Sequence, residues 1–564
     1  MLFRSTGYEY SKNAGNTWQT DNVFSGLSSD TSYSIVSRVA ASGGDLASDM
    51  SPVLSVAGMP TVSSISPSSG SISGGKSVTI SGTHFVNVSA VFFGSKASAY
   101  TVISDTQIIA TVPRNNSGVV DITVTTACGT SYISTADQFE YFASNIGVET
   151  EVKVDGKSAS VGTTTSSTDT DGKRTVAVTL DTEELSEVLK SSGSGATVTI
   201  AFKGDCEVNE VILTGQMLRS LEDYDSTLVL ETGEASYFLP SSQIDIGAIA
   251  SQFGTGVSLA DIKVSVKISE PSAGTERIVE NAAEKGKFEI VVPPVDFTIS
   301  YTYNGQTIEE SKFSSYVTRL IAIPSSVDPS KITTAVVLNS EGTLTHVPTQ
   351  IVLIDGAYYA KVMSLTNSVY TLIWHPVEFS DMSGHWAKSA VSDFGSRMIV
   401  NGDENGNFNP DASITRAEFS AIIVRALGLT PSTGESGFGD VSSADWYCGY
   451  IKTARSYGII EGYDAASFGP NDQVSREQAM TMIARAMKIT ELSSNLGYSE
   501  ISTLLLKYTD GASVSDYAEG SVAACINTGI VFGNDDNTLS PKNSVTRAEV
   551  AIMIQRLLQK SGLI

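Results

Sequence analysis

The feature that most limits how this chain can fold is a seventeen-residue pattern that occurs three times towards its C-terminal end. It reads SITRAEFSAIIVRALGL at 413–429, QVSREQAMTMIARAMKI at 473–489 and SVTRAEVAIMIQRLLQK at 544–560. In each copy the apolar residues follow the i, i+3, i+4, i+7, i+8 spacing of a helix that buries one stripe. Three such helices predict three structural repeats, called repeats 1, 2 and 3 below, that share one core.

Each repeated helix begins with a capping box, in which a hydroxyl residue is followed three positions later by Glu or Gln. The hydroxyl accepts from the backbone N–H three residues on, and the longer side chain reaches back to the backbone of the cap. The three pairs are Thr415 and Glu418, Ser475 and Gln478, and Thr546 and Glu549. The cap and the apolar stripe therefore have a purely structural explanation.

An arginine follows each cap, at Arg416, Arg476 and Arg547. The helix dipole disfavours a cation in the first turn, so three arginines at one position predict a role that outweighs this local cost. A guanidinium beside unbonded helix N–H groups would make an anion site. A second row of arginines lies ten residues past each cap, and it predicts salt bridges or amphipathic cover instead: Arg425, Arg485 and Arg556.

The repeats extend upstream of the helices. A glycine precedes each first-turn arginine by fourteen residues, at Gly402, Gly462 and Gly533. Still further upstream lies a pair made of an aspartate and an aromatic residue: Asp381 with Trp386, Asp440 with Trp446, and Asp510 with Tyr517. Each repeat therefore predicts an aspartate, a short helix led by an aromatic residue, a glycine-rich loop and a capped long helix. Repeat 3 is set further along the chain by a polar linker between Lys488 and Tyr508.

With the motifs FSDM, GFGDV, GIIEG and ITRAEF in order, residues 377–564 resemble three tandem S-layer homology (SLH) domains, at 377–430, 436–490 and 506–564. The resemblance implies an α-helical pseudo-trimer in which each repeat gives one helix to a central bundle. It also implies that grooves between the repeats bind secondary cell-wall polysaccharide, whose pyruvate ketals are carboxylate anions.

By matching positions, the resemblance implies that four residues of each repeat line these grooves. They are Asp381, Trp386, Gly402, Arg416, Asp440, Trp446, Gly462, Arg476, Asp510, Tyr517, Gly533 and Arg547. Two departures bear on this expectation. Repeat 2 has Ser475-Arg476-Glu477-Gln478 where the family has Thr-Arg-Ala-Glu, and repeat 3 has Tyr517 in place of Trp. At either departure the groove could bind more weakly or have only a structural role.

Composition excludes several classes of partner. The chain of 564 residues predicts several domains, and its formal net charge of −25, with no basic run, argues against nucleic acid. Capture of an anionic polymer by such a chain must depend on local cationic grooves. No apolar run approaches the ~18 residues of a membrane span. Four dispersed cysteines predict buried free thiols instead of a disulfide framework or a zinc site: Cys128, Cys206, Cys448 and Cys525.

The N-terminal segment, residues 1–57, resembles the last part of a fibronectin type III domain. Its stretch GLSSDTSYSIVSRVAAS at 26–42 alternates as a strand, and Tyr33 stands where a sandwich domain places its corner tyrosine. The first residues lack the apolar core of a secretory signal, which predicts that residue 1 is not the natural start of the full protein.

Residues 60–142 consist of short alternating runs separated by Gly and Pro, which predicts a small all-β sandwich. They resemble the immunoglobulin-like IPT/TIG family, with turn positions at Pro67, Gly70, Gly74, Gly75, Gly82, Phe85, Gly94 and Pro113. The stretch GSISGGKS at 70–77 also satisfies the phosphate-binding pattern G-x-x-x-x-G-K-[ST]. That loop requires a following helix, whereas the residues after Ser77 alternate as a strand, so we interpret the match as coincidence.

Residues 145–376 predict a β-rich spacer of one or two domains, with one helix at Thr182–Lys190. Their last part resembles segments that precede SLH repeats in other bacterial surface proteins. The four histidines of the chain form neither an H-E-x-x-H motif nor a cluster suited to a metal. The nucleophile motif G-x-S-x-G does not occur. DTDGK at 169–173 is interpreted as a hairpin turn instead of a calcium site. The sequence therefore predicts no catalytic residue, no metal and no cofactor.

The resulting expectation is a multidomain extracellular protein with all-β immunoglobulin-like sandwiches, a β-rich middle and a C-terminal helical SLH pseudo-trimer. Its predicted function is non-covalent anchoring to the bacterial cell wall or S-layer through secondary cell-wall polysaccharide. Possible further partners are other copies of itself or other S-layer proteins. The alternative is the anchored C-terminal part of an extracellular polysaccharide-degrading enzyme whose catalytic module lies upstream.

Overall fold

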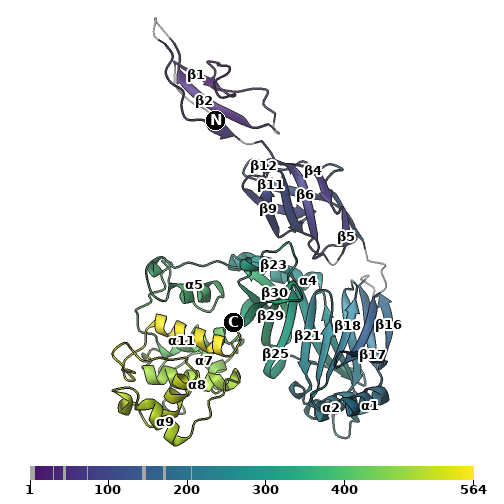
Figure 1. Cartoon of the computed structure of the whole chain (residues 1–564), viewed down its shortest axis with the longest axis vertical. Coiled ribbons are helices and arrows are strands. Elements are labelled where there is room, and N and C mark those ends of the chain that lie inside the picture. The colour runs from purple at the N-terminus through teal and green to yellow at the C-terminus, as the bar shows by residue number, and fades with distance from the viewer. Residues whose placement is uncertain are drawn as a thin grey trace. The chain divides into compact units, whose positions relative to one another are not determined.

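The computed structural model describes residues 7–28, 31–41, 46–56, 58–72, 74–142, 148–168, 173–204 and 206–564. It divides into two compact units. Unit 1 contains residues 1–145 together with 324–328, and unit 2 contains residues 146–323 together with 329–564 (Figure 1). Unit 1 therefore holds the N-terminal segment and the predicted sandwich, while unit 2 holds the middle of the chain and the three repeats.

The N-terminal segment forms an antiparallel sheet of three strands, β1 (Tyr8–Ser11), β2 (Tyr33–Val39) and β3 (Leu54–Val56). The predicted strand at 26–42 is thus confirmed for its second half. Tyr33 opens β2, and its hydroxyl oxygen accepts a hydrogen bond of 2.8 Å from the backbone N–H of Ser28, five residues upstream. A contact back to the preceding turn is what a corner tyrosine makes. The fibronectin type III likeness of this segment stays a prediction.

Residues 61–142 form two facing sheets, as the alternating pattern predicts. One has the order β4 (Thr61–Ser66), β6 (Ser77–Thr83), β10 (Gln107–Thr111) and β9 (Tyr100–Ser104). The other has the order β5 (Ser69–Ser71), β13 (Gln138–Phe142), β11 (Gly118–Thr126), β7 (Val88–Phe93) and β8 (Lys96–Ala97), with β12 (Gly129–Thr130) beside β11. Their core includes an edge-to-face cluster of Phe93, Phe139 and Tyr141.

Three expectations for this sandwich are settled by the strand positions. Strand β6 starts at Ser77, so no helix N-terminus follows GSISGGKS and the phosphate-loop interpretation is excluded. Gly82 lies inside β6 and Gly70 inside β5, so the prediction of turn positions is wrong for both. Glycine is required at 82, since a Cβ there would approach the carbonyl oxygen of Thr61 on β4 to 1.8 Å. Cys128 is exposed in the turn between β11 and β12, which corrects the prediction of a buried thiol. Cys448 and Cys525 are buried, and Cys206 is partly buried.

The middle of the chain forms two large sheets that take strands alternately along the sequence. The first has the order β15 (Lys157–Ser158), β14 (Glu149–Val154), β18 (Thr197–Lys203), β20 (Thr227–Glu231), β21 (Ala235–Pro240), β25 (Lys312–Ala322), β29 (Ala357–Thr366) and β28 (Thr349–Ile354). The second has the order β16 (Gly162–Thr168), β17 (Arg174–Leu180), β19 (Val208–Thr214), β22 (Lys263–Ser269), β23 (Glu289–Tyr303), β30 (Val369–Trp374), β26 (Thr334–Leu338) and β27 (Leu344–Val347), with β24 (Gln306–Glu310) beside β23. One pair of sheets therefore runs through the whole stretch.

Four helices of the described residues pack against these sheets or against one another. They are α1 (Thr182–Ser192), α2 (Gly215–Asp223), α3 (Ile246–Phe253) and α4 (Ala273–Gly286). The predicted helix at 182–190 is α1, and Asp181 caps it by accepting from the backbone N–H groups of Glu183 and Glu184. Strands β16 and β17 pair antiparallel from Thr168 and Arg174 onward, and most of the predicted DTDGK turn between them lies outside the described residues.

Between the two sheets lies a fully buried arginine, Arg319 of β25. Its guanidinium carbon is 4.8 Å from the ring centre of Tyr237, 5.3 Å from that of Phe297 and 4.7 Å from that of Tyr370. Two of its nitrogens donate to the backbone oxygens of Val317 and Thr366. Aromatic faces and carbonyl oxygens thus surround this buried charge.

The three repeats contain the helices α5 (Lys388–Ser396) and α6 (Arg416–Ala426), α7 (Cys448–Ser456) and α8 (Arg476–Ile489), and α10 (Glu519–Asn527) and α11 (Arg547–Lys560). Each short helix starts two residues after Trp386, Trp446 or Tyr517, as the pattern predicts. The linker before repeat 3 holds a further helix, α9 (Tyr498–Leu505), which its polar composition does not indicate. Figure 1 shows α5, α7, α8, α9 and α11 gathered beside the sheets of unit 2.

A ring of backbone hydrogen bonds marks the centre of the repeats. The N–H of Ile414 donates to Val545, that of Val474 donates to Ile414, and that of Val545 donates to Val474, at 3.0 to 3.1 Å. All three side chains are fully buried. Each stands one residue before a helix cap, so the three long helices start from one shared point. This closed ring is the pseudo-threefold arrangement that the resemblance implies.

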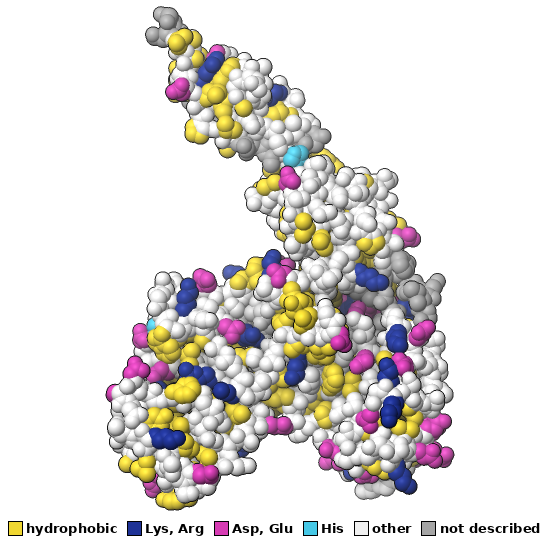
Figure 2. All heavy atoms as spheres, in the orientation of Figure 1, with side chains coloured by type: hydrophobic (Ala, Val, Ile, Leu, Met, Phe, Trp, Pro, Cys, Tyr) yellow, Lys and Arg dark blue, Asp and Glu magenta, His cyan; other side chains and the backbone are white. Residues whose placement is uncertain are grey.

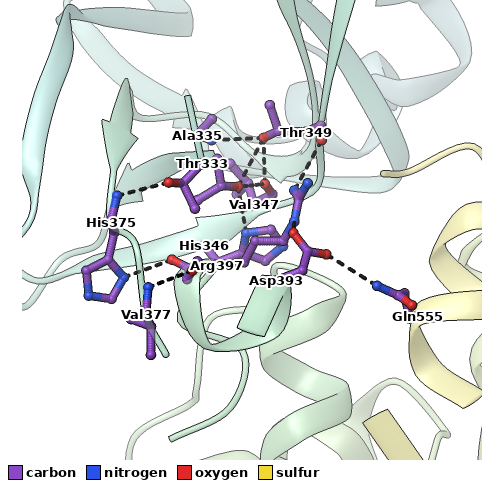
Figure 3. A network of polar contacts seen from close by, with 12 residues as sticks. Thr333, Ala335, His346, Val347, Thr349, His375, Val377, Asp393, Arg397 and Gln555 are labelled. Carbon is purple, nitrogen blue, oxygen red and sulfur yellow. Dashed lines mark hydrogen bonds and ion pairs between the residues drawn. The ribbon is translucent and has the colours of Figure 1, made fainter. Parts of the chain in front are cut away.

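The repeats and the β-rich middle share a core within unit 2. Met363 and Leu365 of β29 belong to the same buried cluster as the repeat helices. The Tyr316 hydroxyl of β25 donates to the backbone oxygen of Leu427 at 2.8 Å, and Arg397 donates to the backbone oxygen of Thr349 at 3.3 Å. Figure 3 shows this junction, where Asp393 also meets Gln555 of α11. The repeats are therefore packed against the sheets directly.

A buried histidine at this junction predicts a pH dependence. His346 lies 2.8 Å from the Thr334 hydroxyl through Nδ1, while Nε2 has no hydrogen-bond partner among the described residues. Burial, followed by the positive charge of Arg397, lowers the pKa of His346 well below its usual range. Below a pH of about 6.5 the histidine of the unfolded chain takes up a proton, whereas His346 in the folded unit stays neutral. Each further drop of one pH unit therefore lowers the free energy of unfolding, by at most about 1.4 kcal/mol.

Urea unfolding of the whole chain at pH 7, 6 and 5 measures this effect. His346→Phe is expected to lose the part of the pH slope that comes from His346. An unchanged slope in that variant would show that other groups carry the acid sensitivity.

Candidate functional site

The backbone at the start of each long helix is bonded to the loop of another repeat. The N–H of Arg416 donates to Asp472 of repeat 2, that of Arg476 to Asn543 of repeat 3, and that of Arg547 to Ala412 of repeat 1, each at 2.9 Å. The next N–H in each helix donates to the carbonyl oxygen of a loop proline: Pro470, Pro541 or Pro410. The prediction of unbonded helix N–H groups beside the arginines is therefore wrong, because the threefold packing supplies their acceptors.

The capping boxes themselves are confirmed in all three repeats. The hydroxyls of Thr415 and Thr546 accept from the N–H three residues on, and Ser475 does the same. In each case the Glu or Gln at the third helical position accepts from the N–H of the cap, at 2.8 to 2.9 Å. The first turn of each long helix is thus fully satisfied without a ligand.

The first-turn arginines cross from one repeat into the loop of another. Arg416 donates through Nε to Phe468 and through Nη2 to Glu461, both backbone oxygens at 2.8 Å. The corresponding acceptors are Phe408 and Asn401 for Arg547, at 2.9 and 3.2 Å, and Phe532 for Arg476, at 3.2 Å. Each arginine therefore fastens two repeats together, a structural role in addition to any contact with a ligand.

Two of the three arginines also form an ion pair with the capping glutamate of the repeat they enter. Arg547 meets Glu418 at 2.8 Å, and Arg476 meets Glu549 at 2.7 Å. Sequence reasoning assigned these glutamates to the cap alone. Each has two carboxylate oxygens, and one serves the cap while the other serves the arginine. This pairing is between repeats, so spacing within a repeat does not indicate it.

The three aspartates brace the loops and do not face a groove with free oxygens. In each repeat both carboxylate oxygens accept from two consecutive backbone N–H groups of the loop, at 2.6 to 2.9 Å for the closest contacts. The pairs are Asp381 with Phe408 and Asn409, Asp440 with Phe468 and Gly469, and Asp510 with Leu539 and Ser540. Although desolvation opposes it, donation from Gly469 and Phe468 lowers the pKa of Asp440.

The loop glycines are required for close packing. A Cβ at Gly462 would lie 2.5 Å from the carbonyl oxygen of Asp464 and 2.5 Å from the ring of Phe438. At Gly533 it would lie 2.3 Å from the ring of Tyr508, and at Gly402 it would lie 3.1 Å from the ring of Phe379. Each glycine thus lets the loop fold over an aromatic ring of its own repeat.

The aromatic residues of the repeats face solvent. Trp386 is 64% exposed, and Trp446 and Tyr517 are each 60% exposed. Large exposed rings at equivalent positions are suited to stacking against the faces of sugar rings. On the face drawn in Figure 2, Lys and Arg side chains lie beside hydrophobic ones over the C-terminal helices.

One groove between the repeats is open, with a volume of about 550 Å³. All three repeats contribute to it: Gly402, Glu418 and Arg425 from repeat 1, Trp446 from repeat 2 and Arg547 from repeat 3. Three of the predicted site residues, a glycine, a tryptophan and an arginine, are thus brought together from different repeats. Asp381 does not line this groove.

The second row of arginines lies against aromatic rings or an acidic residue, as expected for structural cover. Arg425 is 4.6 Å from the ring centre of Tyr450, and Arg556 is 4.8 Å from that of Phe532. Arg485 forms an ion pair of 2.6 Å with Glu461. Arg425 also lines the groove, so this row contributes to the charge there.

No group of three or more His, Cys, Asp and Glu side chains suited to a metal occurs in the part of the chain that the structure describes. Among these residues, no helix has the length and apolar character needed to cross a bilayer.

The fold and the groove define a class: β-rich modules followed by a pseudo-threefold module of capped helices with an aromatic- and arginine-lined groove. Comparison with known families agrees. The IPT/TIG domain family matches residues 60–141, and the S-layer homology domain family matches residues 378–420, 437–480 and 507–551. The chain therefore contains one IPT/TIG domain followed by three SLH repeats, and it belongs to a cell-surface protein. Neither matched family is catalytic.

Similar proteins include both enzymes and surface-layer proteins. The chain is 38% identical over 195 residues to an amylopullulanase of Thermoanaerobacterium thermosulfurigenes, which covers 35% of this chain and 10% of that protein. It is 36% identical over 198 residues to exoglucanase XynX of Acetivibrio thermocellus, covering 35% and 18%. It is 30% identical over 185 residues to the surface-layer 125 kDa protein of Lysinibacillus sphaericus, covering 32% and 15%. The chain thus spans less than a fifth of the length of each of these three relatives.

Proposed function

We propose that the three repeats hold this protein non-covalently on the bacterial cell wall by binding an anionic, pyruvylated secondary cell-wall polysaccharide. The observation that carries the proposal is the groove in which Trp446 and Arg547, from different repeats, lie with Gly402 and Arg425. An exposed indole stacks on a sugar ring, and a guanidinium binds a ketal carboxylate. Because the chain has a net charge of −25, such local cationic grooves are what an anionic polymer requires.

The predicted site residues divide into two roles in this proposal. The aromatic residues Trp386, Trp446 and Tyr517 and the arginines Arg416, Arg476 and Arg547 contact the polymer. The aspartates Asp381, Asp440 and Asp510 and the glycines Gly402, Gly462 and Gly533 shape the loops that form the groove walls, since their contacts are taken up within each repeat.

The sandwich domain and the β-rich sheets would then be spacer, adhesion or lattice-forming modules that the anchor holds on the wall. A second candidate function is the anchored part of an extracellular polysaccharide-degrading enzyme. The names of two relatives, an amylopullulanase and an exoglucanase, favour it, and the chain matches only 10% and 18% of their lengths. In that case the catalytic module lies in sequence beyond this chain, while the anchor works in the same way.

Sedimentation of the whole chain with Gram-positive wall sacks tests the anchoring proposal. Half of the sacks would be stripped of secondary polysaccharide. We expect the chain to sediment with the intact sacks and not with the stripped ones. The triple variant Trp386→Ala, Trp446→Ala, Tyr517→Ala should lose at least tenfold in affinity, since stacking on each ring contributes about 1 kcal/mol. Tyr498→Ala is the control, because Tyr498 on α9 is 80% exposed and does not line the groove. Equal binding to stripped sacks would contradict the proposal.

A further inference from the structure

The three first-turn arginines have different electrostatic surroundings, although they occupy equivalent positions. Arg547 and Arg476 are each neutralised by the capping glutamate of the repeat they enter, Glu418 and Glu549. The equivalent residue of repeat 2, which Arg416 enters, is Gln478. Gln478 uses its carbonyl oxygen to accept from the N–H of Ser475 within its own capping box. Arg416 therefore forms no ion pair with any described residue.

We propose that the site at Arg416, where α6 of repeat 1 meets the loop of repeat 2, is the one of the three that binds a ligand carboxylate most tightly, because Gln478 leaves its guanidinium without a counter-ion. This assignment rests on the proposed function, since it names which of the three equivalent sites contributes most to it. The other two grooves carry an internal ion pair that a ligand carboxylate would have to displace.

The burial of Arg416 strengthens the case. The residue is only 6% exposed, and a buried cation without a counter-ion is costly. Two of its nitrogens donate to backbone oxygens, and the rings of Tyr463 and Phe468 lie 4.7 and 4.5 Å from its guanidinium carbon. The remaining guanidinium nitrogen, Nη1, has no hydrogen-bond partner among the described residues. Burial lowers the pKa of Arg416, while Asp472 and Asp440 oppose this from beyond ion-pair distance.

The remaining members of this groove are also held in place. The Tyr517 hydroxyl lies 3.2 Å from Glu477, and Glu477 in turn forms an ion pair of 2.7 Å with Lys542. Burial and then Glu477 raise the pKa of Tyr517 to about 12, whereas the charges of Arg416 and Arg485 lower it. Alanine stands at the position of Glu477 in repeats 1 and 3, so neither of these repeats has a glutamate that could brace the aromatic residue of its neighbour in this way.

The two departures from the family pattern, at 475–478 and at Tyr517, therefore meet at the contact between the Tyr517 hydroxyl and Glu477. Glu477 fixes the orientation of Tyr517, and Gln478 leaves Arg416 free of a carboxylate. The sequence alone suggested weaker grooves at these positions. The structure instead points to a groove specialised for an anion.

The test is the single substitution Gln478→Glu. Glutamate is the native residue at this capping position in the other two repeats, so the cap is retained while Arg416 gains a counter-ion. The control is Gln559→Glu, which adds the same charge at an exposed position near the end of α11. Titration calorimetry of the whole chain would use purified secondary polysaccharide from wall sacks, before and after mild acid removal of its ketals.

We expect Gln478→Glu to weaken binding of the native polymer at least fivefold and Gln559→Glu to change it less than twofold. The Gln478→Glu variant should melt no lower than the unchanged chain, because Arg416 gains a counter-ion. If Gln478→Glu binds like the unchanged chain, while that chain still prefers the native polymer to the ketal-free one, the assignment of the groove is overturned and the anchoring function stands. If the unchanged chain does not distinguish the two polymers, the proposed function fails and the assignment fails with it.

Discussion

Replacing Val474 with Asp is expected to unfold the three repeats. Val474 is fully buried where the repeats meet, and its backbone donates to Ile414 and accepts from Val545 in the central ring. A carboxylate at this point would face two apolar side chains without a cation or a hydrogen-bond donor among them. Burial of an unpaired charge costs more than about 4 kcal/mol, which is a large fraction of the stability of an ordinary domain.

Urea unfolding followed by circular dichroism at 222 nm measures this loss, because most helices of unit 2 belong to the repeats. The matched control is Val474→Ile, which places in repeat 2 the residue that repeat 1 has at 414. Its cost is expected to stay below about 1.5 kcal/mol. A helical transition at the same urea concentration in the Asp variant and the unchanged chain would show that the ring is not the centre on which the repeats depend.

Replacing Gly462 with Ala is expected to destabilise repeat 2 by about 3 kcal/mol, at the upper end of the usual cost of overpacking. The added Cβ would lie 2.5 to 2.6 Å from the backbone oxygens of Asp464 and Ser467 and from the ring of Phe438. Backbone atoms on two sides cannot move away without opening the loop. That loop supplies Glu461, whose carbonyl oxygen binds Arg416, so the groove between repeats 1 and 2 should open as well.

The same substitution in repeat 1 provides the comparison. At Gly402 the nearest atoms to an added Cβ are 3.1 Å away, so Gly402→Ala is expected to cost clearly less, about 1 kcal/mol. Melting temperatures of both variants, and their sedimentation with wall sacks, measure the difference. Equal losses, or a larger loss for Gly402→Ala, would contradict the steric explanation.

The helices of the repeats could be predicted from the sequence because their signals are local. The stripe of apolar residues, the capping boxes and the offset of the aromatic residues all act within a few turns of chain, and α6, α8 and α11 begin at Arg416, Arg476 and Arg547 as expected. The strands of the sandwich follow equally from alternation. For the middle of the chain the sequence predicted strands but not their arrangement, because the two sheets take strands alternately from distant parts of the chain.

The contacts between repeats could not be predicted in this way. Spacing within a repeat does not say that Arg547 reaches Glu418, which lies 129 residues earlier in the chain. This spacing also does not indicate that loop carbonyl groups of another repeat accept from the helix N–H groups. The expectation of unbonded helix N–H groups beside the arginines was wrong for that reason. The presence of Gln478 in place of a glutamate can be interpreted only once the structure shows that Arg416 enters repeat 2.

The most direct test of the anchoring function is the affinity of the whole, unchanged chain for one purified wall polysaccharide in two forms, with its pyruvate ketals intact and with the ketals removed. If guanidinium groups in the grooves bind ketal carboxylates, the intact polymer should bind at least tenfold more tightly, the equivalent of about 1.4 kcal/mol for one charge-assisted contact. Added salt should reduce the difference. Equal affinity for the two forms would contradict the account, since the arginines would then join the repeats without contacting the wall.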